Sequence, residues 1–502
     1  MKKTVTGTLW LFTGLFLAAM FLPRLAPQGL FGDGLLYASM ARNLAEGKGS
    51  MWAPWFSSGY WLEFASGAPY FENPPLMLWL QAGFFHLFGD HWWVEKLYSL
   101  LLFVLNAWLI VRAWEVPLRG TVYQKRFGWI PLLCWYFTMP AIWGNPNNLM
   151  DNNLLGFCLL ALWIGLEGMF AEKSRNLPFL WAGAVVFLGL MTKGPVGLYP
   201  AAAPFLLVLA QKATSQPARY SPGTGLWRSC LIGFTALALF VIMLLLIPES
   251  QHYFEQYWQR RLGVVLSGVR EDAEMTGWAR LHIFRILVKE QAGLIGLFLL
   301  LYFFYRRSRM DTAFRRERML ALFFLFMGFA ATLPIMLSAR QNGIYVIPGM
   351  PMFALAAGFF YLPFINKLLL DPTEAQIHFF GRLRVWLIAG VFVLAAYTAF
   401  LFGKPGRDNG ILHDLPYLQR IIPAGSTVAV CEGLMYNQQA HTYLQRFHHL
   451  ELSPNIDSCR FALASPRCDI SSHEDWESRG FIRADSAEFP GEAYILYERT
   501  DK

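Results

Sequence analysis

Eleven apolar runs dominate the sequence, and each has about the length that a helix needs to cross a lipid bilayer. A crossing takes about 17–25 predominantly apolar residues. The runs occupy residues 5–23, 93–113, 127–144, 152–171, 177–191, 194–211, 228–247, 288–305, 319–338, 342–364 and 384–403. Charged residues make up only 15% of the chain, whereas soluble proteins carry about 25%. The pattern predicts an α-helical polytopic membrane protein with about eleven transmembrane helices. It excludes a disordered chain, a disulfide scaffold and a nucleic-acid binder with basic tails.

Basic residues divide the loops between these runs into two classes. Twenty Lys and Arg but only six acidic residues, a net charge of +14, fall in loops 1–4, 112–126, 171–177, 211–228, 306–318 and 366–384. Short loops rich in Lys and Arg stay in the cytoplasm, so we expect the N-terminus inside a bacterial inner membrane. The odd number of crossings then places residues 404–502, with a net charge of −4, in the periplasm. The overall charge of +8 is therefore a signal of orientation and gives no reason to expect a nucleic-acid partner.

Two domains follow from this division. Residues 1–403 are predicted to form the transmembrane domain, with a first periplasmic loop at 24–92, and residues 404–502 to form a small periplasmic α/β domain. The first apolar run is interpreted as an uncleaved anchor, because no small-residue cleavage site follows it. The C-terminal domain has short β-like runs at 426–431 and 494–497. A Cys459–Cys468 disulfide is one of two equal alternatives there, the other being free thiols.

The first periplasmic loop contains a further apolar stretch, residues 76–89, and many aromatic side chains. If this stretch crossed the membrane, the basic loop 112–126 would move outside, against the charge rule. We therefore expect juxtamembrane helices that lie flat at the outer surface of the bilayer. The aromatic side chains suit either a membrane belt or a surface that guides a prenyl chain and stacks on a sugar.

Polar side chains from distant parts of the chain meet at the same predicted outer face. They are the carboxylates Asp33, Glu72 and Asp151 and the cations Lys193, Arg260, Arg261 and Arg340. Cations grip a phosphate and stabilise it as it leaves, whereas a carboxylate accepts a proton from an incoming hydroxyl. This mixture favours transfer of a group from a phosphate-linked lipid carrier.

Each of these residues also has a plainer interpretation. Asp33 suits the N-cap of a helix over 34–46, and Asp151 suits the cap of the span that begins near 152. Lys193 and Arg340 suit headgroup anchors, Arg260 and Arg261 suit contacts with anionic lipid, and Glu72 suits a turn. His86 and His91 flank Asp90, and for these as for His252 and His282 we expect interfacial solvation instead of metal binding.

Four motifs in a fixed order carry a family resemblance over roughly residues 30–365. They are Gly32-Asp33 with Tyr37-Ala38 and Ala41-Arg42, then Tyr70 to Leu76, then Asp151 at the start of a span, then Leu190 to Gly197. The set resembles the polyprenyl-phosphate-sugar glycosyltransferases of family 39, which include protein O-mannosyltransferases and the lipid A aminoarabinose transferase and share the GT-C membrane fold. The segment Ser338 to Pro348, with Tyr345, is similar to a later Lys/Arg–Tyr–Pro segment of that family.

The resemblance implies roles at matching positions. Asp33 matches the first-loop acid that deprotonates or orients the acceptor, and Glu72 matches a cavity glutamate that binds a metal in some members. Lys193, Arg260 and Tyr345 match positions near the donor phosphate, and Asp151 matches an acid that supports the cavity. To these we add Arg261 and Arg340 as phosphate-binding residues and Tyr37 and Tyr70 as substrate-positioning residues.

The sequence also departs from the family pattern. Gly34 stands where many members have a second acid, and Asn73 stands where a lysine is common. Tyr257 aligns with a metal-binding histidine of the lipid A transferase, so a zinc site like that enzyme's and the same sugar transfer are not implied. No cofactor is assigned, and a divalent metal stays an open alternative with Glu72 as its one candidate ligand.

The residues and the resemblance together predict an enzyme that transfers a sugar from a polyprenyl-phosphate carrier to an acceptor on the periplasmic face. A protein hydroxyl, lipid A and another glycan remain alternatives for the acceptor. The competing interpretation is a transporter or flippase of lipid-linked sugars. Transporters keep ionisable residues deep within their spans, whereas here charged residues such as Glu167 lie near span ends.

Overall fold

The computed structural model describes residues 2–58, 69–173, 175–217, 219–267, 281–306, 314–338, 341–369, 372–465, 468, 475–484, 489–491 and 493–500. The chain forms two compact units. Unit 1 comprises Met1–Leu22 and Leu100–Tyr397, and unit 2 comprises Pro23–Ser99 and Thr398–Lys502. The first predicted loop therefore belongs to the same unit as the C-terminal segment.

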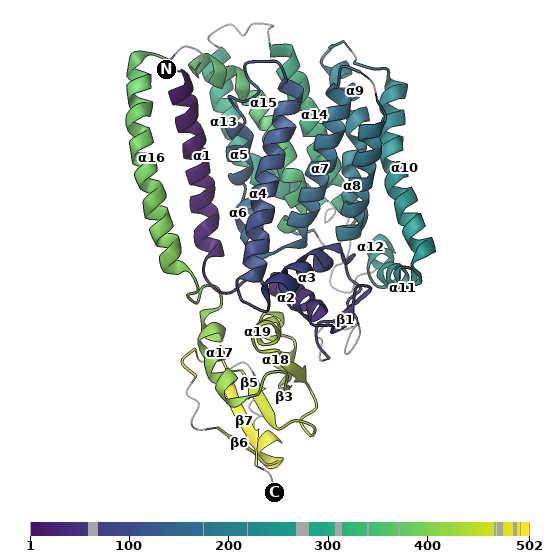
Figure 1. Cartoon of the computed structure of the whole chain (residues 1–502), viewed down its shortest axis with the longest axis vertical. Coiled ribbons are helices and arrows are strands. Elements are labelled where there is room, and N and C mark those ends of the chain that lie inside the picture. Colours follow the sequence, from purple (N-terminus) through teal and green to yellow (C-terminus); the bar gives the residue numbers. More distant parts are fainter. Residues whose placement is uncertain are drawn as a thin grey trace. The chain divides into compact units, whose positions relative to one another are not determined.

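Unit 1 is a bundle of helices (Figure 1). Its long helices are α1 (Lys2–Leu25), α4 (Val94–Glu115), α7 (Met150–Phe170), α8 (Leu177–Lys193), α10 (Pro222–Leu246), α13 (His282–Arg306), α14 (Arg315–Thr332), α15 (Met350–Leu369) and α16 (Glu374–Leu401). Shorter helices are α5 (Trp129–Tyr136), α6 (Met139–Gly144), α9 (Ala203–Ala213), α11 (Pro248–Tyr257) and α12 (Gly263–Ser267). The 3₁₀ or π turns are η1 (Val116–Leu118), η2 (Asn145–Asn147), η3 (Gly194–Ala202), η4 (Trp258–Leu262), η7 (Leu333–Leu337) and η8 (Gly343–Gly349).

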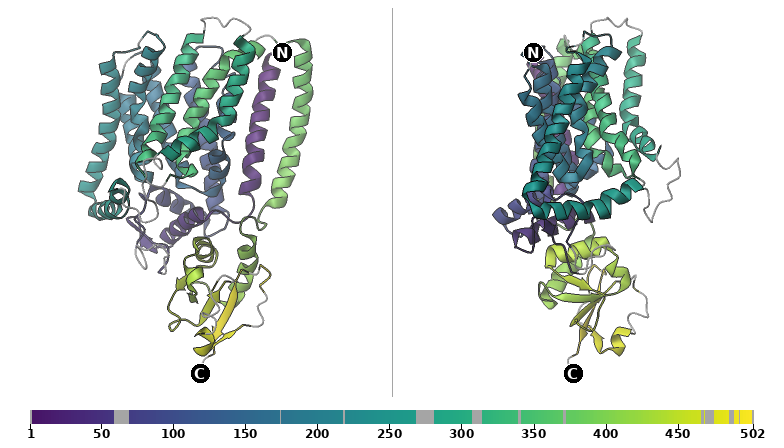
Figure 2. Two further views of the ribbon diagram at one scale, coloured as in Figure 1. Left: turned by 180° about the vertical axis from the view of Figure 1, so that it is seen from behind. Right: turned by 90° about the vertical axis from the view of Figure 1, so that its right-hand side faces the viewer.

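The apolar surfaces of the outer helices of this bundle are explained by contact with lipid. Few side chains of α10, α13 and α16 are buried, although these helices are strongly apolar. The interior is instead sealed by aromatic rings, such as Trp114 on α4, whose ring centroid lies 4.2 Å from that of Phe359 on α15. Helices α1 and α16 lie side by side (Figures 1 and 2), and the Thr8 hydroxyl donates to the carbonyl of Phe380 across them at 3.3 Å. The expectation of a multi-pass helical membrane protein is confirmed.

Nine helical stretches in the described part of the chain are long and apolar enough to cross a membrane, compared with the eleven runs in the sequence. The predicted span 127–144 is split into α5 and α6, because the chain becomes extended at Thr138 and Pro140 follows in the first turn of α6. The predicted spans 177–191 and 194–211 are both helical, but α8, η3 and α9 follow one another without a break and count as a single stretch, Leu177–Ala213. These two differences account for the lower number.

Glycines turn the chain inside the stretch Leu177–Ala213. Gly194 ends α8 with a φ of +72°, a conformation that side chains with a Cβ rarely adopt. A Cβ on Gly197 would lie 2.6 Å from the carbonyl carbon of Gly189. Since only hydrogen fits there, η3 folds back against α8, and α9 then continues in the opposite direction (Figure 1).

Unit 2 combines the first loop with the C-terminal segment. From the first loop come α2 (Gly32–Ala45), β1 (Gly49–Ser50), β2 (Ala53–Pro54) and α3 (Leu76–Phe88). From the C-terminal segment come α17 (Asn409–Ile421), β3 (Thr427–Val430), α18 (Glu432–Met435), α19 (Gln438–His448), β4 (Glu451–Ser453), β5 (Phe461–Ala464), β6 (Phe481–Arg483) and β7 (Ile495–Arg499). Helix α3, with 13 residues, is about 20 Å long and thus too short for a crossing.

A mixed five-stranded sheet forms the base of unit 2 (Figure 2). The strand order is β4-β3-β5-β7-β6, with β3 parallel to β4 and β5 and with β7 antiparallel to β5 and β6. All four residues of β5 are buried, as expected for a central strand covered on both faces. Strands β3 and β7 correspond to the β-like runs predicted at 426–431 and 494–497. The predicted small α/β region is thus present.

Backbone pairing joins the two parts of unit 2. The amide of Gln28 donates to the carbonyl of Lys404 at 2.8 Å, and the amide of Gly406 donates to the carbonyl of Gln28 at 3.2 Å. Gly403 permits this approach with a φ of +76°. The chain that leaves α1 therefore runs beside the chain that leaves α16.

The disulfide alternative between Cys459 and Cys468 is wrong. Cys468 instead pairs with Cys431, which follows β3, and their Cα atoms are 6.1 Å apart. Cys459 is a buried thiol beside the carbonyl oxygen of Asn455, at 3.3 Å. Because β3 and β5 are parallel neighbours, the residues that follow their carboxyl ends meet, and this brings Cys431 to Cys468.

Candidate functional site

An ion pair joins two of the predicted site residues in unit 1. Nζ of Lys193 lies 2.6 Å from both carboxylate oxygens of Asp151. Asp151 is in the first turn of α7 and Lys193 is the last residue of α8, so a short antiparallel connection brings these helix ends together. Both charges also suit the helix dipoles, because an acid lies at an N-terminus and a cation at a C-terminus. Asp151 is not an N-cap, since Leu149 occupies that position.

Tyr345 lies next to this pair. Nζ of Lys193 is 5.0 Å from the centroid of the Tyr345 ring, a cation–π distance. Tyr345 belongs to η8, which is capped by the Asn342 side chain and held against η3 by a hydrogen bond from the Tyr199 hydroxyl to the carbonyl of Pro348, at 3.0 Å. The structure therefore brings three predicted residues, Asp151, Lys193 and Tyr345, into one cluster.

Tyr257 borders the same turn. Its hydroxyl occupies the space that a side chain on Gly194 would need, so the glycine allows the phenol to approach the backbone directly after Lys193. Burial raises the pKa of Tyr257 to about 12, although the charge of Arg261 opposes the rise. A phenol that keeps its proton at neutral pH is a poor metal ligand, so Tyr257 does not fit the histidine position of a zinc site.

Arg260 and Arg261 lie on η4, a π-helical turn that follows α11. Both side chains are partly buried. Helices α9 and α10 are consecutive and antiparallel, so α10 ends on the side of the bundle where α8 ends. The turn η4, which follows α10 and α11, therefore lies at the same end of the bundle as the C-terminus of α8 (Figure 1). Arg340 lies outside the described residues.

The described basic loops of unit 1 lie at the opposite end of the bundle from this cluster. The chain direction places the connections after η1, α7 and α9 at one end and the starts of α7 and α13 at the other (Figure 1). Arg119 and Lys212, for instance, belong to the first end and Lys193 to the second. This separation matches the charge pattern from which the membrane orientation was predicted.

Asp33 and Tyr37, in unit 2, both lie on α2. Asp33 is in the first turn of this helix, whose N-cap is Phe31, so the interpretation of Asp33 as the N-cap is wrong. Its carboxylate oxygen Oδ1 accepts a hydrogen bond from Nε2 of Gln438, at 2.6 Å. Tyr37 is buried one turn further along.

Glu72 precedes α3 in a turn with Tyr70 and Asn73. The amide of Tyr70 donates to the carbonyl of Pro54 at 2.8 Å, and the side-chain amide of Asn73 donates to the Tyr70 hydroxyl at 2.8 Å. Tyr70 is buried and Glu72 is partly buried. Asn73 thus holds the hydroxyl of Tyr70, a predicted substrate-positioning residue.

A buried ion network in unit 2 was not predicted from the sequence. The guanidinium of Arg446, on α19, contacts Asp90 at 2.5 Å and Glu95 at 2.8 Å, and the side chains of Arg446 and Glu95 are 2% and 0% exposed. Arg42, on α2, donates to the carbonyls of Gln445 and Arg446 at 3.0 and 3.1 Å. The only sequence signal is the charged pair Glu95-Lys96 at the start of an apolar run.

The network shifts the pKa values of its members. Burial by itself would raise the pKa of Asp90, but a hydrogen bond with His449 and the charge of Arg446 lower it to about 2. Burial and the neighbouring Arg446 lower the pKa of Arg42 to about 10, which leaves it charged at neutral pH. Glu46, Asp90 and His449 also form a group with the geometry of metal ligands. However, Asp90 already contacts Arg446, so its charge is neutralised without a metal.

A second group missed from the sequence surrounds Glu451. Its Oε2 accepts hydrogen bonds from the Ser57 and Ser58 hydroxyls, at 2.8 and 2.7 Å, and Nε2 of His441 lies 3.2 Å from Oγ of Ser57. Burial lowers the pKa of His441 to about 3, so this imidazole is neutral. Ser57 contacts both Glu451 and His441. In a catalytic triad the histidine instead lies between the serine and the carboxylate. These residues anchor the first loop to β4.

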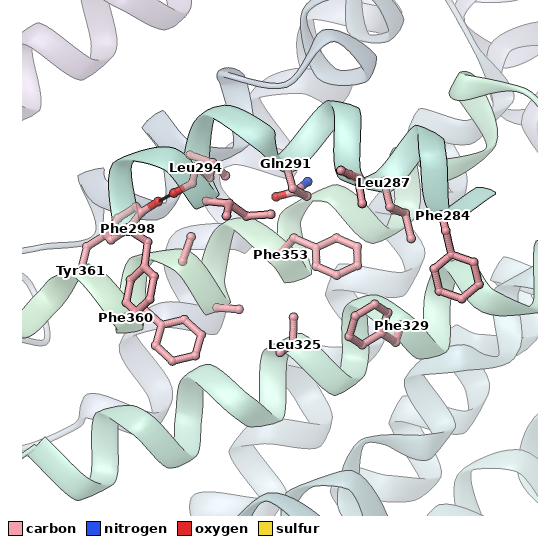
Figure 3. A pocket seen from close by; sticks show the side chains of 14 residues that line it. Phe284, Leu287, Gln291, Leu294, Phe298, Leu325, Phe329, Phe353, Phe360 and Tyr361 are labelled. Carbon is pink, nitrogen blue, oxygen red and sulfur yellow. Dashed lines mark hydrogen bonds between the residues drawn. The ribbon is translucent and has the colours of Figure 1, made fainter. Parts of the chain in front are cut away.

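An apolar cavity of about 340 Å³ lies within unit 1 between α13, α14 and α15 (Figure 3). Figure 3 shows Phe284, Phe329 and Phe353 at one side and Phe298 and Phe360 at the other. Gln291 is the one amide side chain that lines it, among apolar and aromatic groups. Such a lining suits a hydrocarbon chain better than a polar substrate.

Comparisons with known proteins agree with this architecture. Residues 72–244 match the family model described as dolichyl-phosphate-mannose-protein mannosyltransferase. A search of curated proteins finds no match in sequence.

Solved structures share the fold along nearly the whole chain. ArnT from Cupriavidus metallidurans bound to undecaprenyl phosphate is similar with a TM-score of 0.63 and 16% identity, over 99% of each chain. The apo state of the same protein is similar with a TM-score of 0.62 and 15% identity, again over 99% of each chain. The oligosaccharyltransferase of Archaeoglobus fulgidus in complex with Zn and sulfate is similar with a TM-score of 0.50 and 11% identity. This match covers 90% of this chain and 67% of the oligosaccharyltransferase chain. The GT-C fold predicted from the sequence is confirmed, and the family match supports a GT-C glycosyltransferase.

Proposed function

We propose that this protein transfers a sugar from a polyprenyl-phosphate carrier to an acceptor on the periplasmic face of a bacterial inner membrane. The observation that carries the proposal is the cluster of Lys193, Asp151 and Tyr345 at the end of unit 1 opposite its basic loops. A largely buried ammonium held by a carboxylate at the end of an apolar bundle suits the phosphate of a lipid whose chain lies in the bilayer.

Lys193 binds the donor phosphate in this proposal. An ammonium has three donors, and the two oxygens of Asp151 engage it from one side. Asp151 orients the ammonium instead of taking part in proton transfer. Positive charge for the phosphate also comes from Arg260 and Arg261 on η4 and, as predicted from the sequence, from Arg340. The Tyr345 ring packs against the Lys193 ammonium and limits its movement.

The reaction is a single displacement at the anomeric carbon. The acceptor hydroxyl forms the new bond to this carbon while the bond from the carbon to the phosphate oxygen breaks. The proton of the hydroxyl passes to the carboxylate of Asp33, and the bonding electrons leave with the lipid phosphate. Its growing negative charge is stabilised by Lys193 and the arginines. Tyr37 and Tyr70 shape the acceptor side, as does Glu72.

The apolar cavity between α13, α14 and α15 accommodates part of the carrier chain in this proposal. Helix α15 continues directly from η8, so the same segment supplies Tyr345 and the cavity residue Phe353. The ArnT structure from C. metallidurans binds undecaprenyl phosphate. A long prenyl chain in this cavity would keep the phosphate at the end of the bundle where Lys193 lies.

Deletion and complementation test the proposal. The gene is deleted in its host, and lipid A and glycoproteins are compared by mass spectrometry before and after complementation with the wild-type protein or with Lys193→Met. We expect a sugar mass to disappear from one acceptor class and to return only with the wild-type protein. Unchanged masses in every class, together with accumulation of a lipid-linked sugar inside the cell, would favour the flippase alternative.

A further inference from the structure

We propose that Gln438, on the first turn of α19, is a positioning residue for Asp33, so that the C-terminal segment completes the acceptor side of the active site. The inference rests on the proposed function, in which Asp33 receives the proton of the acceptor. Nε2 of Gln438 donates to Oδ1 of Asp33 at 2.6 Å, across 405 residues of sequence. Both residues belong to unit 2. A hydrogen bond to a carboxylate fixes its rotamer and favours its charged form.

The position of Gln438 is itself well determined. The side chain of Asn437 caps α19 by accepting the amide hydrogen of Ala440, at 3.1 Å. The next residue, Gln439, donates to the carbonyl of Leu30 at 2.9 Å and to Oδ2 of Asp408 at 2.7 Å. The hydroxyl of the fully buried Tyr443 donates to the carbonyl of Arg407 at 3.1 Å. The first half of α19 is thus fixed to the segments that lead into α2 and α17.

Gly32 allows this close contact. A Cβ at position 32 would lie 2.9 Å from Oε1 of Gln439 and 3.4 Å from Cδ of Gln438. The glycine that precedes Asp33 therefore gives the two glutamines room beside the backbone of α2. The Gly32-Asp33 motif of the sequence has a structural partner in α19, which sequence reasoning did not reveal.

The far ends of α2 and α19 are joined as well. Nη2 of Arg42 donates to Oε1 of Gln445 at 2.5 Å, and its Nη1 donates to two carbonyls of the last turn of α19. The helices thus pair start to start and end to end, with contacts about 13 Å apart along α2. Two contacts at this separation fix both the rotation and the direction of α2, and hence the direction of the Asp33 side chain.

Asp33 and Gln438 are both partly buried, so water and an acceptor can reach them. A carboxylate at such a site loses productive orientations if it rotates freely, and proton transfer needs a hydrogen-bond distance. Gln438 restricts the rotation without titrating itself. The acceptor side of the site is therefore shaped by a segment that lies more than 400 residues after the predicted base.

The test uses the full-length protein in nanodiscs, undecaprenyl-phosphate-linked mannose or aminoarabinose as donors, and lipid A or a Ser/Thr peptide as acceptors. Gln438→Met removes the donor at nearly constant length, and Gln438→Glu places a second carboxylate beside Asp33. Gln419→Met is the matched control, because Gln419 donates to the carbonyl of Phe447, at the other end of α19. Asp33→Asn is measured in parallel.

We expect Gln438→Met to lower kcat about tenfold with an unchanged KM for the donor, and to move the acidic limb of the pH profile to higher pH. The limb moves upward because a carboxylate that loses a donated hydrogen bond takes up a proton more readily. Gln438→Glu should lower kcat further and move the limb further. Gln419→Met should match the wild type in both respects.

The outcomes separate this inference from the proposed function. If Asp33→Asn is inactive while Gln438→Met has wild-type kcat and an unchanged acidic limb, the positioning role is wrong and the proposed function stands. A lower kcat with an unshifted limb would mean that Gln438 only supports folding, and would also overturn the role. Full activity of Asp33→Asn would overturn both proposals.

Discussion

Nζ of Lys193 lies 2.6 Å from each carboxylate oxygen of Asp151, which precedes it by 42 residues. The Asp151 side chain is only 5% exposed, and that of Lys193 is 19% exposed. The carboxylate is therefore almost fully enclosed with the ammonium, while the Lys193 side chain keeps some contact with solvent. This asymmetry suits a cation that meets a substrate and an acid that holds the cation in place.

Removal of Lys193 should reduce transfer more than removal of Asp151. We expect Lys193→Met to lower kcat/KM about 100-fold, as the loss of one donor to a developing anion typically does. Asp151→Asn should cost about tenfold, because the cation remains but is less restricted. The exposed Lys212, at the opposite end of the bundle, provides the control Lys212→Met, which should retain wild-type kinetics. Equal losses in the two site variants would argue against the division of roles.

The Arg446 network should stabilise unit 2. Arg446→Met leaves the fully buried Glu95 without its ion-pair partner, whereas Asp90 keeps His449 and Arg42. An uncompensated buried charge costs about 3–5 kcal/mol. Hydrogen exchange measured by mass spectrometry on peptides from α2 and α19 would detect the loss of protection. The control is Arg460→Met, since Arg460 and Glu498 form an exposed pair worth less than about 1 kcal/mol. Unchanged protection in Arg446→Met would show that the network is not a major source of stability.

His441 should make unit 2 less stable in acid. Its pKa is about 3 in the folded chain because of burial, compared with 6.5 for an exposed histidine. The unfolded chain therefore binds a proton first, and this contribution to stability is complete above pH 6.5 and is lost as the pH falls toward 3. We expect His441→Gln to show a smaller fall in melting temperature between pH 6.5 and 4 than the wild type. His413→Gln, at an exposed position, should follow the wild type.

The Cys431–Cys468 disulfide should be detectable and stabilising. The bond joins residues 37 apart, and closing a loop of that size in the unfolded chain is worth about 4 kcal/mol in the chain-entropy model. Tryptic mapping without reduction should yield a Cys431–Cys468 peptide and an unmodified Cys459 that reacts with iodoacetamide only after unfolding. A Cys459–Cys468 peptide would contradict the fold of this sheet.

The periodicity and charge of the sequence predicted the parts of the fold that depend on local chemistry. Long apolar runs specified the bundle, and the basic loops separated its two ends. The runs could not show that Thr138 and Pro140 break one span, or that Gly189 and Gly197 pack the chain back on itself. Those features depend on backbone conformations and close contacts between residues that a hydropathy pattern does not distinguish.

The site was predictable to different extents in the two units. Asp151 and Lys193 flank adjacent predicted spans, so the topology alone placed them at one face, although it could not show their ion pair. The partner of Asp33 lies 405 residues away, and Arg446 finds Glu95 across 351 residues. Single polar residues in an α/β segment carry no signal of such distant contacts. The same applies to the disulfide, which follows from the order of strands β3 and β5 and not from the spacing of the cysteines.

The central claim is sugar transfer from a polyprenyl phosphate with Asp33 as the base, and one measurement tests it most directly. The purified full-length protein and its Asp33→Asn variant, in nanodiscs, are incubated with an undecaprenyl-phosphate-linked sugar and a mixture of lipid A and Ser/Thr peptides. Mass spectrometry then follows both products. We expect the wild type to release undecaprenyl phosphate as one acceptor gains the sugar, and Asp33→Asn to do neither at a measurable rate. Transfer by Asp33→Asn at the wild-type rate, or no consumption of any lipid-linked sugar by the wild type, would contradict the claim.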